Sequence, residues 1–104
     1  MKAILSDAFV VATAANTAYQ VQRTSPVLFR SVAVFGVKSF AASGIPTANT
    51  GDVYLGNSKG QLPIKVESGK FVTIEPPAGQ LYDLRDFWFA AANASDGLAF
   101  ILTA

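Results

Sequence analysis

Two carboxylates lie three positions apart around an arginine, in the segment Asp83-Leu-Arg-Asp86, and they are the first candidates for chemistry. A pair of carboxylates can hydrolyse a glycosidic bond when the two groups converge across a cleft. The spacing alone does not show such convergence. We therefore favour a structural interpretation, in which Asp83 belongs to a turn, Asp86 begins a strand, and both lie near Arg85.

The other residue types offer little catalytic or metal-binding chemistry. The chain has no cysteine and no histidine, so it lacks thiolates, the commonest general base and the commonest metal ligand. Its serines have no histidine to activate them, and Asp52 and Asp96 are too isolated for a calcium site. Residues 49–60, NTGDVYLGNSKG, lack the Gly-Lys-Ser/Thr ending of a phosphate loop. We expect no enzyme activity, no cofactor and no metal.

The composition points instead to a protein that works through contacts. A chain of 104 residues is one domain with one modest core. It is 51% hydrophobic and only 14% charged, whereas an average soluble domain is about 25% charged. A small domain cannot hide that much apolar surface, so we expect part of it to face another chain. The scattered net charge of +1 argues against nucleic acid, and no apolar run is long enough to span a bilayer.

Turn residues divide the chain into about seven short strands. We expect them at residues 19–23, 27–37, 53–55, 62–67, 70–75, 84–92 and 98–102, with a loop over residues 43–51. Within residues 53–55, Val53 and Leu55 should point one way and Tyr54 the other. The sequence Ser95-Asp-Gly97 predicts a hairpin before the last strand. The pattern predicts an all-β, single-domain antiparallel β-sandwich that resembles a jelly roll.

Residues 1–16 have mixed periodicity. Their leucine and alanine spacing fits one face of a helix, whereas the run Phe9-Val-Val11 favours a strand. Asp7 interrupts the apolar stretch, so we do not expect a secretory signal. We interpret residues 1–16 as an N-terminal arm or edge strand, followed by a β-sandwich domain over residues 17–104. The arm should contact another chain rather than fill its own core, with Phe9 and Val11 on one side.

Three aromatic residues, Tyr54, Tyr82 and Trp88, occupy the outward phase of the expected strands. They could stack on sugar rings, but tyrosine and tryptophan are equally suited to subunit contacts or to a second packing face. We favour the contact interpretations. The candidate interface residues are therefore Phe9, Val11, Tyr54, Tyr82 and Trp88.

Four segments of the chain resemble small virion proteins of tailed bacteriophages, the capsid cement (decoration) proteins. The segments are SPVLFRSVAVFG, NTGDVYLGNS, LPIKVESGKFVTIEPP and LRDFWFAAANASDGLAFILTA, and together they lie within residues 25–104. Ser68 stands before the Gly69 turn, where the pattern of the family has a proline.

The resemblance implies a β-rich, often trimeric protein that clamps neighbouring subunits of an assembled phage head. The expected partners are then the major capsid protein and further copies of this chain, as a homotrimer on the capsid surface of the virion, without nucleic acid or membrane. Two alternatives stay open. One is a carbohydrate- or receptor-binding tail-fibre domain, which predicts an aromatic-lined groove around Trp88 or Tyr82. The other is a head–tail or baseplate structural protein.

Overall fold

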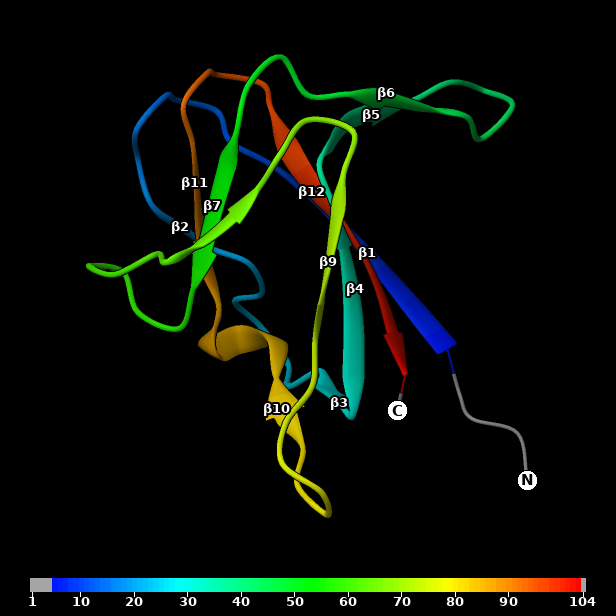
Figure 1. Ribbon diagram of the computed structural model, residues 1–104, viewed down its shortest axis with the longest axis vertical. Helices are drawn as coiled ribbons and strands as arrows, with labels where there is room; N and C mark the ends of the chain where they lie inside the picture. The colour runs from blue at the N-terminus through cyan, green and yellow to red at the C-terminus, as the bar shows by residue number, and fades with distance from the viewer. Residues whose placement is uncertain (1–4, 104) are drawn as a thin grey trace.

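A computed structural model of the chain, which describes residues 5–103, consists of β-strands joined by turns (Figure 1). The expected all-β class with antiparallel sheets is confirmed, since the described residues hold no α-helix and one short 3₁₀ helix, η1 (Leu84–Asp86). These residues contain twelve strands in four small sheets, rather than the seven that we expected. The number rises because residues 27–37 divide among three strands, and because residues 5–11, 46–48 and 82–83 form strands outside the seven expected segments.

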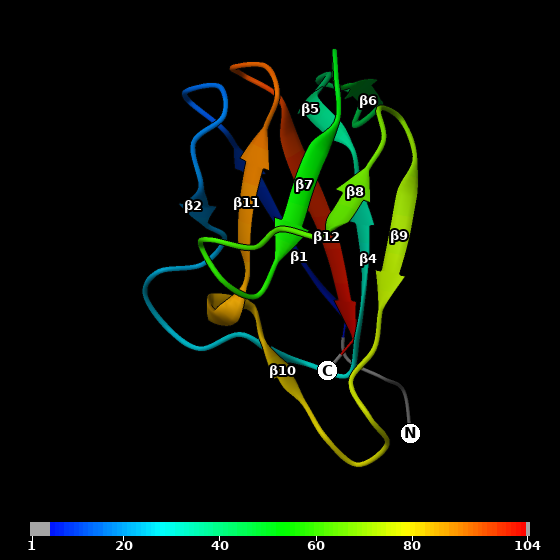
Figure 2. The same ribbon diagram turned by 60° about the vertical axis from the view of Figure 1, so that its left-hand side comes forward.

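Eight of the strands form two antiparallel four-stranded sheets. The first sheet has the order β1 (Leu5–Val11), β12 (Gly97–Thr103), β4 (Ser31–Phe35) and β9 (Phe71–Ile74). The second sheet has the order β2 (Tyr19–Gln20), β11 (Trp88–Ala91), β7 (Val53–Gly56) and β8 (Ile64–Val66). Figure 2 shows β11, β7 and β8 in front of β1, β12 and β4.

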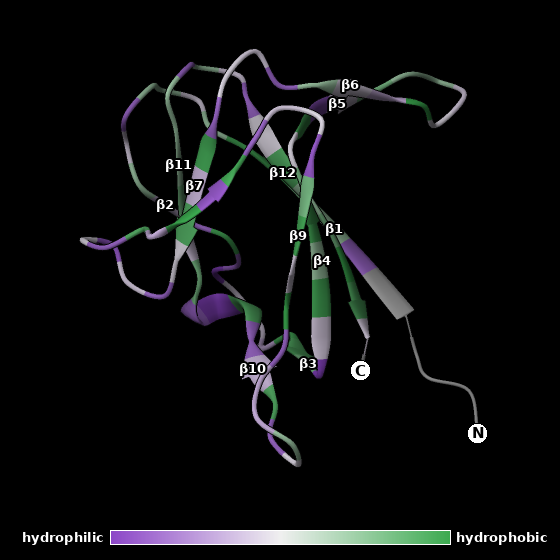
Figure 3. Cartoon of the chain, viewed as in Figure 1, coloured by the Kyte–Doolittle hydropathy of each residue, from purple (hydrophilic) through white to green (hydrophobic). Residues whose placement is uncertain are grey.

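The two sheets share one core. Their inward side chains alternate along each strand with outward ones, as strand geometry requires. The buried cluster takes Val32 and Val34 from β4, Leu98, Phe100 and Leu102 from β12, Val53 and Leu55 from β7, and Phe89 and Ala91 from β11. Figure 3 shows the hydrophobic colour that runs along β4, β7 and β12. The alternation predicted for Val53, Tyr54 and Leu55 is confirmed, because the two aliphatic residues are buried and Tyr54 is exposed.

Residues 27–37, expected as a single strand, divide into β3 (Leu28–Phe29), β4 and the start of β5 (Val37–Phe40). The break before β5 falls at Gly36, where an added Cβ would lie 2.5 Å from the carbonyl oxygen of Glu67. Glycine therefore lets the turn before β9 approach closely, and β5 leaves the sheet. It pairs with β6 (Pro46–Ala48), which lies in the segment that we expected to be a loop.

The two smaller sheets lie at opposite ends of the molecule (Figure 1). One is the hairpin of β5 and β6, and the other pairs β3 with β10 (Tyr82–Asp83). The segment 84–92, expected to be one strand, begins as η1 because Asp83 caps it: the Asp83 carboxylate accepts a hydrogen bond from the Arg85 N–H. Strand β11 starts only after that turn.

The hairpin predicted at Ser95-Asp-Gly97 is wrong. Strand β11, before the turn, belongs to the second sheet, and β12, after it, belongs to the first. The turn therefore carries the chain from one sheet to the other. The physical reason is the Asp96 side chain, which is buried and accepts hydrogen bonds from the 50–51 backbone instead of closing a tight turn.

The described part of the predicted N-terminal arm consists of the edge strand β1 and of residues 12–16, which form no strand, and residues 1–4 of the arm lie outside the described residues. Strand β1 pairs with β12 of its own chain over seven residues without a break in register. Ala8 and Val10 pack against the core, while Phe9 and Val11 are exposed. The arm thus contributes to its own core on one side only.

Candidate interaction surface

The outward side of the first sheet carries a row of apolar side chains that crosses all four strands. Phe9 of β1 is paired with Ala99 of β12, Ala99 with Phe35 of β4, and Phe35 with Phe71 of β9. Residues directly opposite each other in adjacent strands have side chains close enough to touch. The row is therefore one continuous apolar strip on the side of the sheet that faces away from the core.

The hairpin of β5 and β6 extends this strip. The ring of Phe40 packs edge-on against Phe9, with ring centroids 5.3 Å apart, and the rings of Phe35 and Phe71 lie 5.6 Å apart. Between the hairpin and the sheet lies a hollow of about 430 Å³, lined by Asp7, Ala8, Phe9, Phe35, Val37, Phe40, Pro46, Ala99, Phe100 and Ile101. We call the outward residues Phe9, Val11, Phe35, Phe40, Phe71, Ala99 and Ile101 the apolar outer face.

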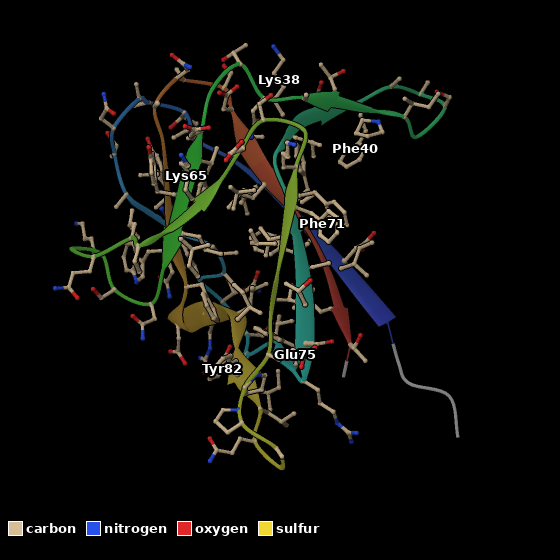
Figure 4. All side chains as sticks on the ribbon, in the orientation of Figure 1. Lys38, Phe40, Lys65, Phe71, Glu75 and Tyr82 are labelled. Atoms are coloured by element: carbon tan, nitrogen blue, oxygen red, sulfur yellow. The ribbon has the colours of Figure 1, made fainter. Side chains whose placement is uncertain are left out.

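Large side chains on this face are open to solvent. Phe71 is 62% exposed, Phe40 and Ile101 are 47% exposed, and Phe9 is 42% exposed. Figure 4 labels Phe40 and Phe71, which come from β5 and β9. Single exposed apolar residues are ordinary, but a contiguous group of them marks an interaction site in a soluble protein. This face is the strongest candidate site in the described part of the chain.

The five candidate interface residues from the sequence lie in three different places. Phe9 and Val11 are on the apolar outer face. Tyr54 and Trp88 project from the outward side of the second sheet, where Trp88 is half-buried and the Lys59 ammonium lies 5.9 Å from its ring. Tyr82 is in the small sheet of β3 and β10, with its ring against Phe29 and Phe87.

Sequence reasoning missed Phe40 and Phe71. Phe40 lies beyond the expected end of its strand, and only the hairpin with β6 brings it to Phe9. Phe71 lies in a strand that we did predict, and it points to the opposite side from Val72. This alternation indicated an outward side chain, and we did not use that signal. Residues 32–35 are apolar at every position in the sequence, and Phe35 is an outward residue of that run.

A second concave region lies beside Tyr82. It has a volume of about 380 Å³ and is lined by Gly56, Asn57, Pro63, Ile64, Ile74, Tyr82, Asp86 and Phe87. An aromatic ring, an amide and a carboxylate thus border one cleft. Trp88 is absent from the lining, so the cleft includes only one of the two aromatic residues that the tail-fibre alternative named.

The Asp83 and Arg85 pair is a local structural contact. The Asp83 carboxylate accepts hydrogen bonds from the Arg85 guanidinium at 2.9 and 3.0 Å, and from the backbone N–H groups of Arg85 and Val27. The Arg85 side chain, through these hydrogen bonds, lowers the pKa of Asp83 below its usual value, and the pKa of Arg85 is raised in return. The Asp83 carboxylate is therefore occupied by Arg85 in its own turn and by the Val27 backbone.

A buried polar clasp joins residues 49–51 to the turn between the sheets. Asp96 is 1% exposed, and its carboxylate accepts hydrogen bonds from the N–H of Thr50 and of Gly51, each at 2.9 Å, and from the Thr50 hydroxyl. Buried polar groups in folded proteins normally have hydrogen-bond partners, as Asp96 does here. The clasp is complete within the chain, which makes Asp96 a structural residue.

Among residues 5–103, no cluster of three or more Asp, Glu, His or Cys residues has the arrangement of a metal site. The same residues contain no helix of the length and hydropathy needed to cross a membrane. The expectation that the chain has no enzyme activity stays a prediction.

Comparison with known proteins identifies no relative. No protein-family model matches the chain, and no similar chain is found among curated proteins or among solved structures.

Proposed function

We propose that this chain is a structural protein of a tailed-bacteriophage virion, a capsid cement (decoration) protein that binds the assembled head and stabilises it. The apolar outer face is the observation that carries the proposal. A protein with a continuous, solvent-exposed apolar strip on a rigid sheet is suited to adhere to another protein surface. The resemblance of residues 25–104 to virion proteins supplies the identity of that surface, the major capsid protein.

The proposed mechanism is mass action. A protein that binds the assembled shell, and not its separated subunits, stabilises the shell by its binding free energy. Many copies on one particle, each bridging neighbouring capsid subunits, multiply a modest contact by multivalency. This mechanism needs no reactive group, which agrees with the absence of histidine and cysteine from the sequence.

We further infer that the two four-stranded sheets are the layers of a β-sandwich with jelly-roll-like connections. Two observations support this interpretation. The inward residues of both sheets form one core, and the chain passes from one sheet to the other after β1, after β8 and after β11. Repeated crossing between two sheets is typical of jelly rolls.

The experiment is a binding assay with empty shells of the major capsid protein from the same virus. Phe71→Asp places a charge on the apolar outer face and is expected to reduce shell binding at least tenfold. Tyr54→Asp, on the outward side of the second sheet, is the matched control and should bind as the unmodified chain does. Equal binding by all three proteins would contradict the proposed surface, and no binding by the unmodified chain would contradict the proposed function.

A second candidate function, carbohydrate binding by a tail-fibre domain, is favoured by the cleft beside Tyr82. An aromatic ring can stack on the apolar face of a sugar while Asn57 and Asp86 hydrogen-bond its hydroxyl groups. A glycan array with the isolated protein tests this candidate. Binding that is lost in Tyr82→Ala and kept in Phe71→Asp would favour the tail-fibre interpretation over the capsid one.

A further inference from the structure

Strand β1 differs from the other three edge strands of the two large sheets. Sheet edges are normally protected from pairing with other chains by shortness, proline, lysine or a bulge. Strand β2 has two residues, β8 has three with Lys65 at its centre, and β9 has four and is followed by Pro76 and Pro77. Strand β1 has seven residues, LSDAFVV, with no proline, no lysine and no break in register, and Asp7 is its one charged residue.

The free edge of β1 presents the backbone groups of its odd-numbered residues. The N–H of Ala12 donates to the Asp96 carbonyl at 2.9 Å, and the Ala12 carbonyl accepts from the Ser95 N–H at 2.8 Å. In antiparallel sheets both groups of a residue point to the same neighbour, and the side alternates along the strand. The backbone groups of Asp7, Phe9 and Val11 therefore point away from β12. Within the described residues no strand pairs with that side.

We propose that β1 pairs antiparallel with β1 of a second copy of this chain, with Phe9 opposite Phe9 of that copy. The contact is isologous: each strand offers the same backbone groups to the other, and a twofold axis passes between the two Phe9 residues. It resembles strand addition at an exposed sheet edge, where main-chain hydrogen bonds supply the affinity.

The position of Asp7 disfavours the registers in which the two Asp7 residues come closer together. With Phe9 opposite Phe9, Asp7 faces Val11 of the second copy, and the two Asp7 residues are four positions, roughly 13 Å, apart along the strands. A shift that opposes Asp7 to Phe9 brings the two carboxylates to diagonal positions about 7–8 Å apart. A further shift opposes Asp7 to Asp7, and like charges directly opposite each other destabilise a strand pair.

This register also joins the apolar outer faces of the two copies. The row from Phe71 through Phe35 and Ala99 ends at Phe9, on the free edge of the sheet. Pairing Phe9 with Phe9 continues the row into the second copy in mirrored order, which doubles its length. The inference that the joined apolar outer faces bind a capsid rests on the proposed function. The pairing of the two β1 strands does not rest on it.

The dimer should be weak. Phe9 and Val11, the two apolar outward side chains at the seam, are 42% and 37% exposed. With about 150–200 Å² for a whole side chain of this kind, they bury on the order of 100 Å² per copy, well below the roughly 800 Å² per partner of a standard interface. We expect a concentration-dependent dimer that the close spacing of copies on a surface would strengthen. An isologous contact closes at two copies, so this pairing alone gives a dimer, and the trimer that we expected stays a prediction.

Disulfide trapping tests the pairing directly, because the chain has no cysteine of its own. Asp7→Cys and Val11→Cys change two exposed side chains that this register places opposite each other. Directly opposed residues have Cα atoms about 5.5 Å apart in a hydrogen-bonded pair, within the range of a disulfide. Under mild oxidation, an equal mixture of the two variants should form the 7–11 disulfide at least tenfold faster than either variant alone. Lys65→Cys, on β8 of the second sheet (Figure 4), gives the rate of random collision.

Two results would overturn the proposal. If the mixture reacts no faster than Lys65→Cys, β1 does not pair with β1. If a mixture of Asp7→Cys and Phe9→Cys forms the mixed 7–9 disulfide faster than the first mixture forms the 7–11 disulfide, the strands pair in another register. Sedimentation of the unmodified chain at rising concentration provides a second test, with an expected shift from 10.9 kDa towards twice that mass. These assays contain no capsid, so their failure is distinguishable from a failure of shell binding.

Discussion

Asn49 and Gly97 are 48 positions apart in the chain and exchange two hydrogen bonds. The Asn49 side-chain Nδ2 donates to the Gly97 carbonyl at 2.8 Å, and the Gly97 N–H donates to Asn49 Oδ1 at 2.9 Å. A side-chain amide thus pairs with the first residue of β12 as a neighbouring strand would. Both residues are buried, so the pair replaces water that their backbone and amide groups would otherwise bind.

Asn49→Ala is expected to lower the free energy of unfolding by about 1–3 kcal/mol, because it leaves the Gly97 N–H and carbonyl buried without partners. Asn49→Asp is the informative second variant. It keeps an acceptor for the N–H but turns a carboxylate oxygen towards the Gly97 carbonyl, so it should destabilise at least as much as alanine at neutral pH. Urea unfolding of the three proteins measures both differences. Unfolding curves that coincide would show that the pair contributes nothing to stability.

Asp96→Ala should lower the free energy of unfolding by about 2–4 kcal/mol, since the N–H groups of Thr50 and Gly51 lose their acceptor. Asp52→Ala is the matched control: it removes a nearby carboxylate that makes no side-chain hydrogen bond among the described residues. Thermal unfolding followed by circular dichroism gives the comparison. An Asp96 variant as stable as the Asp52 variant would refute the role of the clasp.

Asp83→Asn should reduce stability at neutral pH by less than about 1 kcal/mol, because Arg85 is 41% exposed and exposed ion pairs contribute little. The direction of its pH dependence follows from the lowered pKa of Asp83. A depressed pKa in the folded state gives a contribution that is present above the unfolded pKa of about 4 and is lost as the pH falls through the folded value.

The difference in unfolding free energy between the unmodified chain and Asp83→Asn should therefore be constant at neutral pH and shrink in acid. Urea unfolding at pH 7 and at pH 3 measures it. Asp86→Asn controls for general effects of charge. A difference that grows in acid would mean that the Asp83 carboxylate is not stabilised by Arg85 in the folded state.

Several parts of the fold could be predicted from local patterns. The strand expected at residues 98–102 is part of β12, and the alternation of Val53 and Leu55 predicted the inward face of β7. These predictions succeed because a strand with one buried face shows its phase in its own sequence.

The rest depends on partners that are distant in sequence. Nothing near Ser95-Asp-Gly97 shows that Asp96 bonds to residues 50 and 51, so a turn between sheets had the same local signature as a hairpin. The apolar outer face could not be predicted for the same reason. Phe40 joins Phe9 only because β5 leaves the sheet at Gly36 and pairs with β6. Such a face is assembled by topology, which strand patterns alone do not specify.

Phe71→Ser should leave the melting temperature within a few degrees of the original value, because the Phe71 side chain is largely exposed. The same substitution should reduce the binding of a hydrophobic dye to the folded protein. Phe100→Ser, in the core, should instead unfold the protein or lower the melting temperature strongly. Dye fluorescence and thermal melting of both variants distinguish an exposed apolar face from a packed one. Strong destabilisation by Phe71→Ser would mean that this residue belongs to the core.

The most direct test of the capsid proposal is a density map of the virion in which this chain is located and oriented. We expect the chain on the outside of the head, with the outward side of β1, β12 and β4 turned towards the major capsid protein. A chain found in a tail fibre, or bound to the head through the side that carries Tyr54 and Trp88, would contradict it.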